Sequence, residues 1–323
     1  MSELRRLAHQ YTFAPAAVLA AALLIANVVA LPRFGNPDTW IGTLAIFAPF
    51  ALVALASTPP VLSGTGGLDL SIGPLTVLVN LVLVVHLLGG SLGSPEVAIP
   101  ICLALGAAVG ALNGFSVAVL RYPPVIATLC TFLVILGVSL KLTSQPATAP
   151  IGNWTTQLAH KVGPLPGPAI PIAAVLLVWL GVQRLPYYGH LMAIGGDDAT
   201  AFSSGVDVTA VRITAYSLGG AFAGVAGIAL TAVFQSADPN IGASYALIAL
   251  AAVALGGTPV GLGGRGGLLG SLCGAMILYL AQNLLGEVHV ASTWNQVVYG
   301  LLLLGGVVLS TTVSRPPRRA AAG

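Results

Sequence analysis

The sequence predicts an all-α polytopic membrane protein. Only 7% of its 323 residues are charged, 56% are hydrophobic, and the mean hydropathy is +0.95. A soluble domain has about a quarter of its residues charged, so this composition excludes an ordinary water-facing surface. The hydrophobic residues gather in runs of about 20, the length at which an α-helix crosses a hydrocarbon core. These runs lack the period-2 alternation of barrel strands, which leaves helices as the spanning elements.

Ten membrane spans are expected from the apolar runs and the charged residues between them. In short loops, Lys and Arg concentrate on the cytoplasmic side. With ten spans and the N-terminus inside, nine arginines lie inside and three cations lie outside, so both termini are expected to be cytoplasmic. The predicted spans are residues 12–31, 39–58, 68–88, 97–120, 124–143, 168–183, 211–233, 246–260, 268–286 and 294–313.

Glycine and proline concentrate in two segments, one in each half of the chain. The first is Ser63–Pro74 and the second is Gly256–Gly267. Inside a membrane these residues permit close helix packing and broken helices. Each segment is therefore expected to interrupt a helix. The predicted break residues are Gly66, Gly67, Gly73, Gly256, Gly257, Gly264, Arg265 and Gly266.

Asp69 is the one carboxylate embedded in either glycine-rich segment. An ionisable side chain at membrane depth is costly and usually lines a polar cavity, which makes Asp69 a candidate for a transport path. Alternatively, its carboxylate or the Ser71 hydroxyl accepts the free N–H groups that open the next helix, with Pro74 in the first turn. The surrounding Gly and Pro favour the helix cap.

Residues 184–212 are the longest polar stretch on the predicted inner side. A short amphipathic helix is expected at Ala193–Ser204, with Gly205 as its stop. Asp197 and Asp198 fall in its first turn, where the helix dipole favours anions. The apolar stripe of this helix gains no stabilisation in contact with water, which indicates that the helix docks against a partner. Its candidate residues are Gly195, Gly196, Asp197, Asp198, Ala199, Phe202, Ser204 and Gly205.

Four separated blocks resemble the membrane permease of ribose-type sugar ABC importers, in the branched-chain amino acid/sugar permease superfamily. They are Thr65–Gly73, Gly110–Thr131, Ala193–Val206 and Ala251–Gly270, in matching order and approximate spacing. The resemblance implies a type II importer-like fold, a single permease domain over residues 1–323, and a cytoplasmic coupling loop at residues 184–212. It also implies a homodimer in the bacterial inner membrane, cytoplasmic ATPase subunits and an extracytoplasmic sugar-binding protein.

Two positions depart from the pattern of that family. Ser244–Ile248 stands where the family often has Gly-Tyr-Glu-Leu-Asp, so two carboxylates are missing. Phe202 stands where a basic residue is common in the docking segment. The first difference bears on which substrate is carried, and the second bears on the ATPase interface.

The chain has no GxxxxGK[ST] phosphate loop, so it is not expected to bind ATP by that route or to be an enzyme. The expected function is the import of a monosaccharide such as ribose, xylose or another pentose or hexose. Nucleosides or amino acids are alternative substrates. An ion-coupled carrier is a further alternative, although it usually shows ionisable relays. An intramembrane aspartyl protease needs two facing carboxylates, whereas Asp197 and Asp198 are adjacent in a loop.

Weakly polar side chains in or near the spans are candidates for the path of a neutral sugar. Asn and Gln in membrane helices also bond neighbouring helices, and Trp often anchors at the interface, so each has a structural alternative. The three cysteines show no disulfide or metal spacing, and no cofactor, metal or nucleic-acid partner is expected. The path candidates are Asp69, Asn80, Asn113, Gln282, Asn283, Trp294, Asn295 and Gln296.

Overall fold

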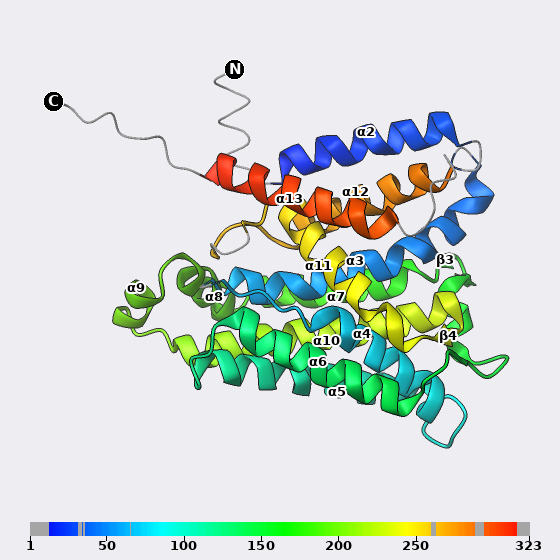
Figure 1. Cartoon of the computed structure of the whole chain (residues 1–323), viewed down its shortest axis with the longest axis horizontal. Helices are drawn as coiled ribbons and strands as arrows, with labels where there is room; N and C mark the ends of the chain where they lie inside the picture. Colours follow the sequence, from blue (N-terminus) through cyan, green and yellow to red (C-terminus); the bar gives the residue numbers. More distant parts are fainter. Residues whose placement is uncertain are drawn as a thin grey trace.

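The computed structural model describes residues 13–31, 34, 36–64, 66–259, 263–287 and 294–314. In these residues the chain is mostly helical, and most helices run along one common direction (Figure 1). Five of the described helices are long and apolar enough to cross a membrane. The number is six if two further helices, which are bent by 85° to each other, form one broken span. Shorter apolar helices accompany them.

Each predicted range coincides with a helix, although membrane crossing by the shorter ones stays a prediction. Residues 186–196 and 198–203, in the predicted coupling loop, are also helical. In chain order the helices are α2 (Ala14–Ala30), α3 (Trp40–Leu62), α4 (Ile72–Leu81), α5 (Pro95–Ala118), α6 (Pro124–Leu142), α7 (Ala169–Gln183), α8 (Pro186–Gly196), α9 (Asp198–Ser203), α10 (Val208–Phe234), α11 (Gly242–Leu255), α12 (Leu268–Glu287) and α13 (Trp294–Ser314).

Short elements complete the described chain. A π-helical turn at Val82–Leu87 extends α4. Single 3₁₀ turns lie at Pro37–Thr39, Trp154–Ala159 and Pro239–Ile241. Two antiparallel pairs of two-residue strands are formed by β1 (Ala147–Thr148) with β4 (Ser236–Ala237), and by β2 (Lys161–Val162) with β3 (Leu165–Pro166).

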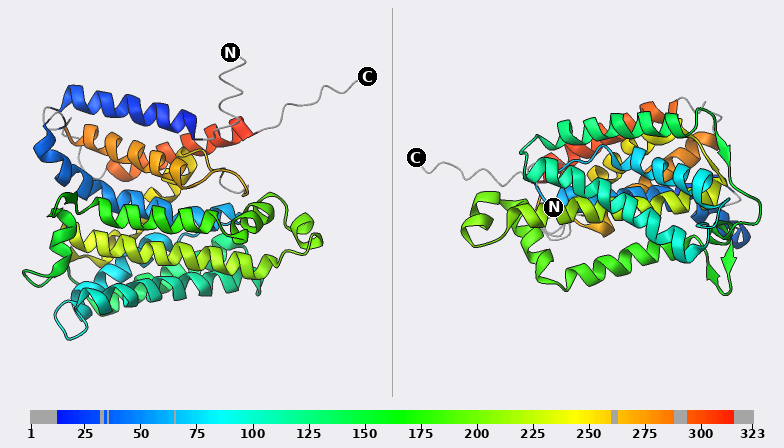
Figure 2. Two further views of the ribbon diagram at one scale, coloured as in Figure 1. Left: turned by 180° about the vertical axis from the view of Figure 1, so that it is seen from behind. Right: turned by 90° about the horizontal axis from the view of Figure 1, so that it is seen from below.

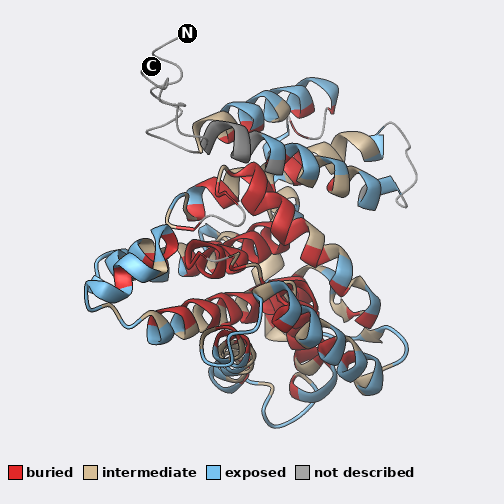
Figure 3. Cartoon of the chain, turned by 60° about the vertical axis from the view of Figure 1, so that its left-hand side comes forward, coloured by how far each residue is buried: buried red, intermediate tan, exposed pale blue. Residues whose placement is uncertain are grey.

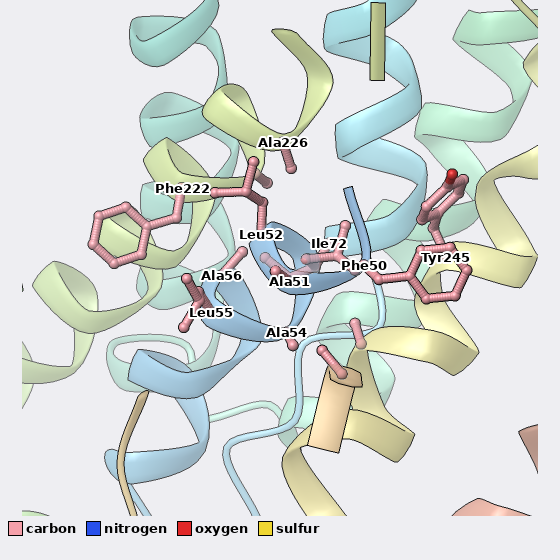
Figure 4. Packing of buried hydrophobic residues seen from close by; sticks show 14 of the residues in the cluster. Phe50, Ala51, Leu52, Ala54, Leu55, Ala56, Ile72, Phe222, Ala226 and Tyr245 are labelled. Carbon is pink, nitrogen blue, oxygen red and sulfur yellow. The ribbon is translucent and has the colours of Figure 1, made fainter. Parts of the chain in front are cut away.

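Helix α3 forms the centre of the bundle. Every residue from Ala48 to Leu62 is buried, so this part of the helix has no exposed side. Figure 4 shows its small and branched side chains packed between α10, which supplies Phe222, and α11, which supplies Tyr245. The rings of Phe50 and Tyr245 meet edge to face, with their centroids 6.2 Å apart. The buried residues form a continuous central zone, whereas peripheral helices show exposed outer faces (Figure 3).

Helices α5 and α10 approach each other through glycines. A Cβ added at Gly106 would lie 2.1 Å from the Gly220 carbonyl oxygen, and a Cβ at Gly220 would lie equally close to the Gly106 oxygen. Small residues allow this close backbone approach, which is typical of helix packing in lipid. The outward sides of the peripheral helices remain apolar, with Leu112 of α5 and Val134 of α6 each more than 60% exposed. Such faces fit a lipid surrounding.

The two ends of the bundle differ. Helices α8 and α9 project beyond the body at one end, and the strands lie at the other end (Figures 1 and 2). The start of α2 and the end of α13 lie toward the same end as α9 (Figure 1). The bundle therefore carries its polar coupling loop and its described chain ends on one side.

Candidate functional site

Asp69 lies in the non-helical segment between α3 and α4 and is 1% exposed. Its Oδ1 accepts hydrogen bonds from the Ser71 backbone N–H at 2.9 Å and from the Ser71 hydroxyl at 2.6 Å. Nδ2 of Asn113 on α5 lies 3.4 Å from both carboxylate oxygens and donates to the Ser71 hydroxyl oxygen at 2.8 Å. Neutral donors therefore surround this buried carboxylate.

Two threonines of α6 continue these contacts. The Thr131 hydroxyl donates to Oδ1 of Asn113 at 2.6 Å. The Thr128 hydroxyl accepts the Leu70 N–H at 3.2 Å and donates to the Pro124 carbonyl of its own helix at 2.8 Å. The segment that follows α3 is thus bonded to both α5 and α6. We call this set of side chains the Asp69 network: Asp69, Ser71, Asn113, Thr128 and Thr131.

The predicted helix cap occurs in an altered form. Asp69 accepts the N–H of Ser71, which immediately precedes α4, as in an Asx-turn. The Ser71 side chain makes no cap bond to the first helical turn, because its hydroxyl is engaged with Asp69 and Asn113. Of the two acceptors that the cap interpretation allowed, the structure uses the Asp69 carboxylate and not the Ser71 hydroxyl. The carboxylate fixes the turn that leads into α4.

The two glycine-rich segments and the coupling loop meet at one point, which we call the glycine junction and define as Gly64, Gly195 and Gly264. A Cβ at Gly195 would lie 2.1 Å from both the Leu62 carbonyl oxygen and the Gly264 nitrogen. Gly64 has φ +74°, and a Cβ there would lie 2.8 Å from the Gly195 Cα. The Gly264 N–H donates to the Leu62 carbonyl at 3.1 Å. Three backbones meet here without side chains between them.

Each glycine-rich segment follows the end of a helix, because α3 ends at Leu62 and α11 ends at Leu255, while the interruption of a membrane span by these segments stays a prediction. Thr65 and residues 260–262 lie outside the described residues. Arg265 is exposed. Among the predicted break residues, those with left-handed backbone are Gly66, Gly257, Gly264 and Gly266, and those in close contact with another backbone segment are Gly67, Gly73 and Gly256.

The coupling loop folds into two helices, so the single helix predicted at Ala193–Ser204 is wrong at its start. Residues 193–196 complete α8, and α9 begins at Asp198. Asp197 is the extended joint between them and the N-cap of α9, and its carboxylate accepts the Thr200 N–H at 2.8 Å. This hydrogen bond holds the pKa of Asp197 below its usual value. An Asp at the N-cap satisfies a free N–H, which a position in the first turn does not provide.

Helix α9 ends at Gly205 as predicted. Gly205 has φ +85°, and the Val206 N–H donates back to the Ala201 carbonyl at 3.1 Å, as in a Schellman-type stop. The predicted apolar stripe is only partly buried. Ile194 is buried, whereas Phe202 is 73% exposed. The helix thus presents an aromatic ring outward.

The sequence analysis missed an ion pair that joins α9 to α10. Nη2 of Arg212 lies 2.7 Å from both carboxylate oxygens of Asp198. The same nitrogen lies 3.4 Å from the Ser63 carbonyl oxygen at the end of α3. Arg212 is 7% exposed, so this charge is paired within the protein. No local spacing signals the pair, because the fold of the intervening loop brings the two residues together.

Asn80 of α4 lies in a different contact from Asp69. Its Nδ2 donates to the Thr231 hydroxyl of α10 at 2.8 Å and to the Ser236 carbonyl at 3.2 Å. Asn80 is fully buried, and its Oδ1 has no hydrogen-bond partner among the described residues. The contact joins α4 to the end of α10, as expected for the structural alternative.

Gln282 and Asn283 join α12 to two other helices. Oε1 of Gln282 accepts the Tyr299 hydroxyl of α13 at 2.5 Å. Nδ2 of Asn283 donates to Oδ1 of Asn27 in α2 at 3.0 Å. These helix contacts are separate from the Asp69 network, so the structure does not bring all path candidates together.

The candidates at the start of α13 lie near the surface. Trp294 is 58% exposed, as an interfacial anchor would be. Nε2 of Gln296 donates to the Ser244 hydroxyl oxygen at 3.4 Å. The side chain of Asn295 lies outside the described part of the chain.

Comparison with known proteins gives a consistent set of matches. A family model described as the branched-chain amino acid transport system / permease component matches residues 39–307. The ribose import permease protein of Bacillus subtilis (strain 168) is 35% identical over 89% of this chain and 89% of its own length. That of Escherichia coli (strain K12) is 34% identical over 90% and 92%. The fructose import permease protein of Bifidobacterium longum (strain NCC 2705) is 30% identical over 81% and 79%. No solved structure matches the chain significantly.

Proposed function

The chain belongs to the branched-chain amino acid transport system permease family, and from this premise we propose that it is the membrane subunit of an ABC importer that moves a monosaccharide into the cytoplasm. Two of its relatives are named for ribose import and one for fructose import, which supports a sugar as the substrate class. The energy comes from a separate ATPase, in agreement with the absence of a GxxxxGK[ST] phosphate loop from the sequence.

The observation that carries the proposal is the attachment of an exposed helix to the break that holds Asp69. Helix α9 projects from the bundle (Figure 1), and its Phe202 is exposed. At the base of this helix, Gly195 of α8 meets the end of α3 in the glycine junction, and the guanidinium that pairs with Asp198 lies 3.4 Å from the Ser63 carbonyl oxygen. A subunit that moves α9 would therefore act on the segment that leads to Asp69. We assign the residue 184–212 loop to the ATPase contact.

The topology that we propose has ten spans with both termini in the cytoplasm. Its support is that the start of α2 and the end of α13 lie toward the end of the bundle that carries α9 (Figure 1). The sugar-binding protein then docks at the opposite end, near the strands. A second copy of the chain pairs along an apolar face within the bilayer, as in a type II importer.

We propose that the Asp69 network shapes the sugar path. Its polar atoms bond one another, and both Asp69 and Asn113 are no more than 1% exposed. A neutral sugar passes a path of this kind without meeting an unpaired charge, which keeps release fast. The other candidates, which bond neighbouring helices, set the positions of the spans that surround the path.

Reconstitution tests this proposal. Vesicles that contain the chain, its ATPase and its binding protein should accumulate radiolabelled ribose or fructose when ATP is present. Vesicles that contain the chain alone should neither hydrolyse ATP nor accumulate sugar. Uptake by the chain alone under a proton gradient would instead show a secondary carrier. If unlabelled nucleosides or amino acids compete for uptake and unlabelled sugars do not, the substrate is a nucleoside or an amino acid.

A further inference from the structure

Tyr216 of α10 carries a hydroxyl that the described structure leaves unused. The side chain is fully buried, and its hydroxyl has no hydrogen-bond partner among the described residues. A buried polar group without a partner is costly, and most such groups in folded proteins are satisfied. An unbonded hydroxyl at this depth therefore indicates a group that takes a partner in another conformation.

The ring of Tyr216 lies directly beside the Asp69 network. It packs against Val117 of α5 and Ala127 of α6. Val117 follows Asn113 by four residues, and Ala127 precedes Thr131 by four residues, so each is one helical turn from a member of the network. A Cβ at Gly114, which follows Asn113 in α5, would lie 3.1 Å from the Tyr216 Cβ. Tyr216 thus packs against the part of α5 that supplies Asn113 to the Asp69 network.

On its other side, Tyr216 is linked to the projecting helix. Arg212 precedes Tyr216 by four residues and lies on the same face of α10. Its guanidinium is bonded to Asp198, the first residue of α9. All six residues of α9 are described, and Ala201 alone is buried, so apolar packing holds this helix weakly. The ion pair is therefore a main attachment of α9 to the body.

We propose that Asp198, Arg212 and Tyr216 form a polar relay that couples the position of α9 to the Asp69 network. When α9 moves, the ion pair shifts the first turns of α10, and the Tyr216 hydroxyl donates to the Asp69 carboxylate. The new bond competes with those from Ser71 and Asn113 and loosens the segment before α4. Tyr216 acts here as a positioning residue. The relay rests on the proposed function, in which α9 contacts the ATPase.

Tyr216→Phe tests the relay in the complete importer, reconstituted with its ATPase and binding protein. This variant removes a hydroxyl without a bond, so a merely structural role predicts equal or higher thermal stability and unchanged transport. The relay predicts normal assembly and stability but a ratio of ribose imported to ATP hydrolysed that falls about 5-fold or more. An unchanged ratio would overturn the relay. Loss of ATPase binding would also overturn it, because Tyr216 would then be needed for binding the ATPase.

Ser217→Ala is the matched control. Ser217 follows Tyr216 in α10, and its hydroxyl donates to the Ala107 carbonyl of α5 at 3.1 Å, outside the relay. We expect this variant to keep the wild-type ratio of transport to hydrolysis. An equal loss in both variants would contradict the relay, because any disturbance of this end of α10 would then suffice.

A double-mutant cycle gives a second, independent measurement. If Asp198→Asn and Tyr216→Phe interrupt one relay, the double variant should be no worse than the poorer single variant, whereas additive losses would contradict the relay.

The wild-type complex separates the two proposals. If it shows no ATP-dependent uptake of ribose or fructose, the proposed function fails. If it transports normally and Tyr216→Phe does too, only the relay fails.

Discussion

The two glycine-rich segments begin alike and are held in different ways. Each segment turns at a left-handed glycine just after its helix. After α3 this is Gly64, with φ +74°, and after α11 it is Gly257, with φ +78°. Both segments also reach the glycine junction, through Gly64 and Gly264. Beyond these similarities, the first segment contains a carboxylate that accepts hydrogen bonds from Ser71 of its own segment and from Asn113 of α5, and the second contains none.

The contacts of the second segment depend on shape. A Cβ at Gly256 would lie 2.3 Å from the Gly270 carbonyl group, and one at Gly266 would lie 2.3 Å from the Thr258 hydroxyl oxygen. The first segment also makes close backbone contacts, at Gly67 and Gly73, and the hydrogen bonds of Asp69 are what it has in addition. Close backbone contacts cannot give way, whereas hydrogen bonds can exchange partners. The comparison indicates that the glycines of both segments serve packing and that Asp69 adds a part that can move. Substitutions in the two segments should therefore fail differently.

Gly256→Ala should have the largest effect on folding. The added methyl group meets backbone atoms of α12, which cannot rotate away, so we expect a cost of about 3 kcal/mol, at the upper end of overpacking. The yield of monodisperse protein in detergent and its thermal midpoint measure this loss. Gly267→Ala is the control, because a Cβ there meets nothing within 4 Å. Equal stability of the two variants would contradict the packing role of the second segment.

Asp69→Asn should have the next largest effect, on the first segment. An Asn keeps an acceptor for Ser71 but turns an amide toward Nδ2 of Asn113, which lies 3.4 Å from both carboxylate oxygens. Two facing donors leave a buried group unsatisfied, and we expect a cost of about 2 kcal/mol. Thermal unfolding in detergent measures it.

The exchanged pair Asp69→Asn with Asn113→Asp sharpens this result. It restores one acceptor opposite one donor, so stability and ribose uptake should both recover if the network acts through hydrogen bonds. A pair that folds normally but does not transport would instead show that the path needs a charge at position 69. The cap interpretation would then be wrong.

Gly205→Val should have a smaller and local effect at the end of α9. A Cβ at this position meets nothing within 4 Å, so the cost comes from the backbone at φ +85° and amounts to about 1 kcal/mol. We expect weaker binding of the ATPase in a pull-down while the permease still inserts in the membrane. Gly181→Val in α7, which also meets no atom within 4 Å, lacks a left-handed backbone and lies outside the coupling loop, is the matched control. Normal ATPase capture by Gly205→Val would contradict the docking role.

The smallest expected effect is a pH dependence at the start of α9. The Thr200 N–H stabilises the ionised form of Asp197, so the folded pKa lies below the usual value of 3.8. The stabilisation is therefore complete above that value and is lost as the pH falls through the lower, folded pKa. Hydrogen exchange of the Thr200 amide should show falling protection at acidic pH. Asp197→Asn, which keeps an acceptor, should remove this dependence, and an unchanged profile would contradict it.

Sequence reasoning succeeded where the cause lies within a few residues. The helices follow the apolar runs, and α9 stops at Gly205, because a left-handed turn there favours glycine. It failed at the start of α9, since Asp197 and Asp198 are both plausible there and only one is the N-cap. It also grouped Asn80 and Asn283 with Asp69, although each bonds a different neighbouring helix.

By itself, the sequence determined the class of the protein and the positions of its helices and breaks. Those properties follow from the length and composition of local segments, which the bilayer thickness and the backbone of glycine constrain directly. Only the tertiary structure decided that Gly64, Gly195 and Gly264 meet, and that Tyr216 packs against Val117 of α5 and Ala127 of α6. Helices in lipid are apolar on both their buried and their outer faces, so their sequences do not show which residues face each other.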